Sequence, residues 1–203
     1  MCIRDRINSK IKKNQKTVVF ADGEDENTLK AAIAFKNSGL GTPIIVAKEN
    51  VVKERLKEIG YGENLDIRIV NSTNKEMRDK YVKLLFKKMH RDQGLLERDC
   101  DRMVRTDRVI WASCMVECGD ADAMVTGNTR RYSQSLEKIK KVIPARLGEI
   151  MFGLNMVVSK GKTVFIGDTS VNEYPTSKEL ADIAISSARA VSYTHLTLPT
   201  NTT

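Results

Sequence analysis

Aromatic residues are scarce in this chain, and those present do not form a strip with basic residues. They make up 5% of the 203 residues, whereas proteins that stack nucleic-acid bases need aromatic side chains interleaved with positive charge. The net charge is +8, but the cations alternate with acids, as in the segment KERLKE at 53–58. Such mixing is typical of a solvated helix face. We therefore expect no nucleic-acid partner.

Long apolar runs are also absent. No stretch approaches the roughly 20 apolar residues that span a bilayer, and the N-terminal region lacks the apolar segment of a secretory signal. These absences predict a protein without membrane contact, and the cysteine usage described next predicts a cytoplasmic location.

Metal and nucleotide motifs are absent as well. The chain has four cysteines and two histidines, and their spacing matches no zinc site. Cys114 and Cys118 lie four apart on a segment with the pattern of a buried helix, so we interpret them as free core thiols of a protein from a reducing compartment. Neither a Gly-x-Gly-x-x-Gly sequence nor a Walker loop is present, which predicts no dinucleotide or ATP cradle of a known kind.

The two ends of the chain differ in composition from the rest. Residues 192–203 contain no Lys, Arg, Asp or Glu, in a chain whose charged residues amount to 30%. Residues 1–6 do not match the rest either, and both ends resemble translated sequencing-adapter read-through. We therefore expect 1–6 and 192–203 to be non-native, and His195 is left out of the functional argument.

Between residues 7 and 144, β-branched runs alternate with amphipathic helical patterns. The runs predict strands at 17–21, 43–47, 66–70 and 122–126. The helical periodicity predicts helices at 26–38, 49–59, 75–91, 95–104, 107–118 and 132–143. This alternation favours βαβ units and a parallel sheet covered on both faces, which is a three-layer α/β fold.

The pattern changes after Pro144. The elements expected there are strands at 150–158 and 163–166, joined by a tight turn at 159–162, and a helix at 176–191. We therefore predict a first α/β subdomain at 7–144 and the start of a second, truncated α/β subdomain at 145–191.

The strongest candidate for a ligand site follows the fourth predicted strand. In an open parallel sheet, ligands bind at the carboxyl ends of the strands, and the next helix offers free N–H groups and a positive dipole end to an anion. The segment combines a glycine for close backbone approach with hydroxyl side chains and two arginines suited to phosphate. Its residues are Thr126, Gly127, Asn128, Thr129, Arg130 and Arg131. The alternative is a plain strand-to-helix turn with two solvated arginines.

Two other loops carry acids after predicted strands. Asp168, in the loop at 168–175, could hold a hydroxyl, a backbone amide or a partner residue; the alternative is an Asx-type turn that caps the following helix. The acidic loop at 21–25 disfavours a phosphate at that point and suits a helix cap or an interface. A lone acidic cluster is not a metal site without geometry, so no metal ligand is assigned.

Three segments, in this order, resemble the phosphate acetyl/butyryltransferase family. They are FADGED at 20–25, GDADAMVTG at 119–127 and DTSVN at 168–172. Each segment is short, but the joint pattern is specific, and the likeness extends over nearly all of 7–191. The resemblance implies a fold of phosphate acetyltransferase type, with two α/β segments and a ligand cleft between them.

Within this family, the chain is most similar to the C-terminal domain of bacterial NADP-dependent malic enzymes. The stretches that carry this likeness are ERDCDRMV at 97–104, Asp107-Arg108 and MVTGNTRRY at 124–132. It implies a fragment of an enzyme that oxidatively decarboxylates malate to pyruvate with NADP and Mg²⁺ or Mn²⁺. Those cofactors would bind an absent upstream domain, so none is expected here.

The same likeness implies that this domain serves homo-oligomer assembly and regulation by acetyl-CoA or a related acyl ligand. We assign that ligand, as a hypothesis, to the loop from Thr126 to Arg131 and to Asp168. In true acyltransferases of the family the catalytic Ser, Asp and Arg lie mostly beyond the end of this sequence. Active members also tend to carry an Arg on the helix after the Thr-Gly loop, where Glu137 stands here.

We therefore assign no catalytic residue to this chain. The alternative function is a fragment of an active phosphate acetyl/butyryltransferase, which moves an acyl group between CoA and phosphate.

Overall fold

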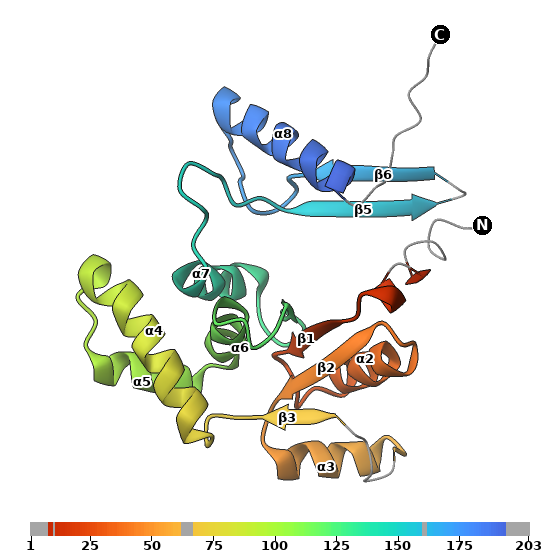
Figure 1. Ribbon diagram of the computed structural model, residues 1–203, viewed down its shortest axis with the longest axis vertical. Helices are drawn as coiled ribbons and strands as arrows, with labels where there is room; N and C mark the ends of the chain where they lie inside the picture. The colour runs from red at the N-terminus through yellow and green to blue at the C-terminus, as the bar shows by residue number, and fades with distance from the viewer. Residues whose placement is uncertain (1–7, 10, 62–66, 160–161, 194–203) are drawn as a thin grey trace. The chain divides into compact units, whose positions relative to one another are not determined.

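The computed structural model describes residues 8–9, 11–61, 67–159 and 162–193. The chain divides into two compact units, Asn8–Pro144 and a second unit that begins at Ala145 (Figure 1). Residues 1–6 and 194–203, which the composition predicts to be non-native, lie outside the described residues.

A four-stranded parallel sheet forms the centre of the first unit. Its strands are β1 (Lys16–Phe20), β2 (Gly41–Val46), β3 (Arg68–Val70) and β4 (Ala123–Val125), in the order β3-β2-β1-β4. β1 pairs with both β2 and β4, so that Phe20 lies between Ile45 and Val125. The parallel sheet predicted from the alternating pattern is therefore confirmed.

The helices of this unit begin within a few residues of the predicted positions. They are α2 (Glu26–Asn37), α3 (Glu49–Glu58), α4 (Lys75–Gln93), α5 (Glu97–Thr106), α6 (Arg108–Glu117) and α7 (Tyr132–Val142). Asp25, Asn74 and Asp107 cap α2, α4 and α6 by accepting first-turn backbone N–H groups. Gly94 ends α4 at a φ of 64°, a left-handed conformation that glycine adopts without strain.

Helices cover the sheet on both faces, because successive side chains on a strand point to opposite sides. Val19 packs among residues of α4, α5, α6 and α7. Its neighbour Phe20 packs among residues of α2 and α3. The first unit is thus the expected three-layer α/β arrangement, with α2 and α3 on one face and the longer helical segment on the other (Figure 1).

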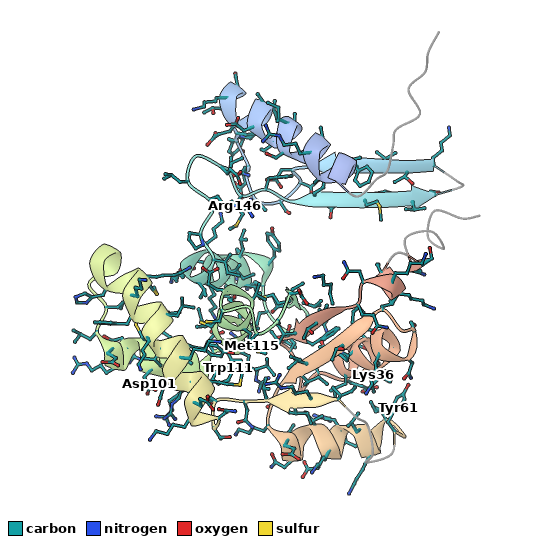
Figure 2. All side chains as sticks on the ribbon, in the orientation of Figure 1. Lys36, Tyr61, Asp101, Trp111, Met115 and Arg146 are labelled. Carbon is teal, nitrogen blue, oxygen red and sulfur yellow. The ribbon has the colours of Figure 1, made fainter. Side chains whose placement is uncertain are left out.

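Helix α6 is the most buried helix of the first unit. Its side chains from Val109 to Met115 are all buried, and Trp111 and Met115 are labelled in Figure 2. The ring of Tyr81 meets the Trp111 indole edge to face, with centroids 5.0 Å apart. Cys114 is a buried free thiol of this helix, and burial raises its pKa. Burial on all sides explains why α6 has apolar residues around its whole circumference.

The second unit contains an antiparallel hairpin and one helix among its described residues. β5 (Leu154–Ser159) pairs with β6 (Lys162–Gly167), and α8 spans Ser177–Tyr193. The strand predicted to start at 150 starts at Leu154 instead. Leu154 already pairs with Gly167, the last residue of β6, so residues 150–153 have no partner strand on that side. None of the helices in the part of the chain that the structure describes could cross a membrane.

Candidate functional site

The loop between β4 and α7 lies at the carboxyl edge of the sheet, next to the end of β1. Phe20 and Val125 pair at the ends of these neighbouring parallel strands, so the segments that follow them meet at one edge. Gly127 has a φ of 107°, which a side chain would make unfavourable. The sequence placed its candidate ligand loop and its acidic loop far apart in the chain, and the sheet brings them together.

The Asp22 carboxylate accepts hydrogen bonds from several residues of this loop. Its Oδ2 accepts from the backbone N–H of Gly127 at 3.0 Å and of Asn128 at 3.2 Å. Its Oδ1 accepts from the Thr129 hydroxyl at 2.6 Å, and the Thr126 hydroxyl lies 3.5 Å from Oδ2. Only 4% of Asp22 is exposed. The backbone donors predicted to bind an external anion therefore bind a carboxylate of the protein itself.

Asp25 ties the same loop to helix α2. Its carboxylate accepts from the backbone N–H of Thr28 at 2.9 Å and from Asn128 Nδ2 at 2.5 Å. The hydrogen bond from the Thr28 N–H is the main reason that the pKa of Asp25 lies below its usual value. The acidic loop at 21–25 thus combines a helix cap, at Asp25, with an internal anchor, at Asp22.

Arg130 is committed to a second carboxylate, that of Asp107. Arg130 Nη1 lies 3.0 Å from Asp107 Oδ2, and Lys138 Nζ lies 2.5 Å from the same oxygen. The other oxygen, Oδ1, caps α6 through the N–H groups of Val109 and Ile110. Burial alone would raise the pKa of Asp107, but the hydrogen bond from Lys138 and the charge of Arg130 outweigh it and lower the pKa.

The remaining charged residues, Arg131 and Glu137, differ in whether they have an ion-pair partner. Arg131 is exposed, and no described residue forms an ion pair or a side-chain hydrogen bond with it. Glu137, on α7, pairs with Lys141 at 2.8 Å, and that hydrogen bond lowers its pKa. Arg131 is therefore the cation of the predicted site that stays available to a ligand.

Asp168 lies in the second unit and organises its own loop. Its carboxylate accepts from the backbone N–H of Ser170, Val171 and Asn172 at 3.0 to 3.1 Å, and from the Asn172 side chain at 2.7 Å. Burial would raise the pKa of Asp168, and these hydrogen bonds lower it. This is the geometry of an Asx-type turn. Helix α8 is started separately, by reciprocal bonds between Thr176 and Glu179.

Two residues of the site were not predicted from the sequence. Asp107 was given as the start of a predicted helix and as part of a family likeness but not as a site residue, and Lys138 was not singled out. Lys138 lies on the predicted amphipathic helix at 132–143, where nothing local marks it as an ion-pair partner. Across residues 8–9, 11–61, 67–159 and 162–193, no group of three or more His, Cys, Asp and Glu side chains is arranged to hold a metal.

Comparison with known proteins relates this fold and loop to one family. The family model described as phosphate acetyl/butaryl transferase matches residues 2–197. The NADP-dependent malic enzyme of Rhizobium meliloti is 38% identical over 180 residues, which cover 88% of this chain and 24% of that enzyme. The phosphate acetyltransferase of Helicobacter pylori is 28% identical over 185 residues, 90% of this chain and 35% of that protein.

A solved structure supports the same fold. The EutD phosphotransacetylase of Staphylococcus aureus superposes with a TM-score of 0.84 at 20% identity, over 96% of this chain and 59% of that one. The chain thus spans about a quarter of the malic enzyme relative and somewhat more than half of the phosphotransacetylase chain. The α/β class expected from the sequence is confirmed by this likeness.

Proposed function

Since the chain belongs to the phosphate acetyl/butaryl transferase family, we propose that it is the regulatory and assembly domain of an NADP-dependent malic enzyme. The enzyme that contains it would decarboxylate malate oxidatively to pyruvate, with NADP and Mg²⁺ or Mn²⁺ held outside this chain. The greater identity to a malic enzyme, 38% against 28% for a phosphate acetyltransferase, supports this assignment.

The observation that carries the proposal is the set of hydrogen bonds between Asp22 and the β4–α7 loop. Phosphate or an acyl phosphate at this loop would compete with a carboxylate that already accepts from the Gly127 and Asn128 N–H groups. A phosphate bound at these N–H groups would lie next to the Asp22 carboxylate, and two negative charges in contact repel each other strongly when they are partly buried. This arrangement favours a domain that binds a ligand without catalysing acyl transfer.

The ligand proposed for this domain is acetyl-CoA or a related acyl-CoA, whose phosphates would contact the exposed Arg131 and not the Gly127 and Asn128 N–H groups, which Asp22 already occupies. Arginine suits phosphate because its planar guanidinium donates two parallel hydrogen bonds. Binding would change the packing between identical subunits and so the activity of the malic enzyme domain. Such coupling between sites is typically about 1–3 kcal/mol.

Two assays on the complete protein distinguish this function from that of an active phosphate acetyltransferase. We expect malate-dependent reduction of NADP that acetyl-CoA inhibits, and no phosphate-dependent release of CoA from acetyl-CoA. CoA release is followed with a thiol reagent, and NADPH by absorbance. Phosphate-dependent CoA release, without any reduction of NADP, would establish the acyltransferase function and overturn the proposal.

Replacing Arg131 with alanine is expected to raise the acetyl-CoA concentration for half-inhibition by about tenfold or more, since one charged phosphate contact contributes about 1.5–3 kcal/mol. Arg131→Ala is preferred to a change at Arg130, whose loss would also leave Asp107 less well paired. The matched control is Lys140→Ala, which removes an exposed cation from α7, the helix that begins after Arg131. Equal inhibition of the Arg131→Ala protein and the unmodified protein would show that Arg131 does not contact the ligand.

A further inference from the structure

A cavity of about 190 Å³ opens in the first unit, beside the β4–α7 loop but not lined by its residues. One wall follows the carboxyl ends of β2 and β3 and includes Lys48, Asn71 and Ser72. The opposite wall is the junction of α5 and α6, from Val104 to Trp111. The volume corresponds to roughly six water molecules. It therefore suits a small metabolite.

The cavity carries an excess of positive charge. Lys48, Arg105 and Arg108 line it, together with the acids Glu24 and Asp107. Arg108 is matched by Glu24, with Nη2 and Oε2 2.5 Å apart. Asp107 is already neutralised from outside the cavity, by Arg130 and Lys138. Two cations on the cavity wall, Lys48 and Arg105, are left to attract an anion.

Lys48 and Arg105 make few interactions with other side chains of the protein. No described residue forms an ion pair with the Lys48 ammonium. Arg105 Nη1 lies 3.7 Å from Asp101 Oδ2, beyond hydrogen-bond distance, and 59% of its side chain is exposed. Lys48 is also the N-cap residue of α3 and makes no capping bond with its side chain. The first N–H groups of α3 therefore start at the cavity without a side-chain cap, and such a helix end favours anions.

A buried donor in the cavity wall lacks an acceptor. Trp111 is 1% exposed and lines the cavity, and its Nε1–H has no hydrogen-bond partner among the described residues. Burying an indole N–H without an acceptor is unfavourable. The nitrogen itself is enclosed, so an oxygen of a molecule in the cavity would reach it only after a small turn of the indole. Trp111 therefore adds to the cavity wall a side chain with an unsatisfied donor.

We propose that this cavity binds a small organic anion, distinct from the acyl-CoA proposed for the β4–α7 loop. Lys48, Arg105 and the N-terminus of α3 would hold its oxyanion, and its body would lie beside the Trp111 indole. Phosphate esters and carboxylates share this chemistry. Asp107 lines the cavity and pairs with Arg130, so this residue physically connects the new site with the β4–α7 loop.

The chain contains a single tryptophan, so its fluorescence reports directly on the cavity. Titration with glycerol 3-phosphate is expected to change the Trp111 emission saturably, and neutral glycerol is expected to leave it unchanged. Glycerate, the matched carboxylate, identifies which oxyanion is preferred. Calorimetry with the same three compounds measures binding that does not alter the emission. Saturable binding of either anion supports the proposal, and the stronger one names its class.

Charge variants locate the bound anion. Arg105→Gln and Lys48→Gln are each expected to weaken binding about tenfold, the loss of one charge-assisted contact. Arg102→Gln is the control, because it removes a cation from the same helix as Arg105 without touching the cavity. Circular dichroism verifies that all three variants are folded. The proposal is overturned if neither anion binds at concentrations up to about 10 mM. It is also overturned if Arg102→Gln weakens binding as much as Arg105→Gln does.

Discussion

Replacing Asp22 with alanine is expected to lower the free energy of unfolding of the first unit by about 2–4 kcal/mol, the cost of leaving several partly buried donors without an acceptor. The donors are the N–H groups of Gly127 and Asn128 and the hydroxyl of Thr129. Urea denaturation followed by Trp111 emission measures this change, since Trp111 lies in the core of the same unit.

Two further variants show whether the loss comes from the hydrogen bonds. Asp22→Asn keeps one oxygen for the backbone N–H groups, and the Thr129 hydroxyl can turn to accept from the new amide. We therefore expect it to lose less than half as much stability as Asp22→Ala. Asp79→Ala, which removes an exposed carboxylate, should cost less than about 0.5 kcal/mol. An Asp22→Ala protein as stable as the Asp79→Ala protein would contradict the role given to Asp22.

Replacing Asp107 with alanine is expected to cost a comparable amount, about 2–4 kcal/mol, because the side chain has two functions. It caps α6 through Val109 and Ile110, and it is the shared partner of Arg130 and Lys138 with only 16% of its side chain exposed. Without it, two cations face each other across the vacated position. The measurement is again urea denaturation.

The pH dependence of Asp107→Asn separates these two functions. Asparagine retains the cap and removes the charge. Because the pKa of Asp107 is lowered in the folded chain, its charge stabilises the fold above the unfolded pKa of about 3.9 and ceases to do so as the pH falls through the folded value. The stability difference between the unmodified chain and Asp107→Asn should therefore be largest near neutral pH and shrink below about pH 4. A difference independent of pH would show that the charge contributes nothing.

The loop from Thr126 to Arg131 is held by two carboxylates of the protein. Asp22 and Asp107 bind residues of the segment from Thr126 to Arg130, while no described residue forms an ion pair or a side-chain hydrogen bond with Arg131. A rigid loop with one uncommitted cation is suited to sense a phosphate-bearing ligand, because little conformational entropy is lost on binding. Variants at Asp22 and Asp107 should thus weaken inhibition by acetyl-CoA indirectly, and only those that keep the fold intact are informative.

Much of the fold could be predicted from local signals in the sequence. The apolar runs that contain Val19 and Ile45 indicated buried parallel strands, since both faces of such strands are covered. Asp107 lies at the start of the predicted helix at 107–118, and Gly94 follows the helix that the periodicity began at 75. These signals act over a few residues, so the sequence displays them directly. The three short family segments supplied the fold type, which the EutD likeness confirmed.

The arrangement of the candidate site depended on the tertiary structure. The sequence identified the loop from Thr126 to Arg131 but could not show that Asp22 fills its anion position, because the two segments are 105 residues apart at Gly127. Whether they meet depends on β1 and β4 being neighbours in the sheet. The same holds for Lys138 and Asp107 and for the cavity beside Trp111. The sequence shows which charged groups and donors the chain contains. The packing of strands and helices decides which of them have a partner inside the protein and which remain available to a ligand.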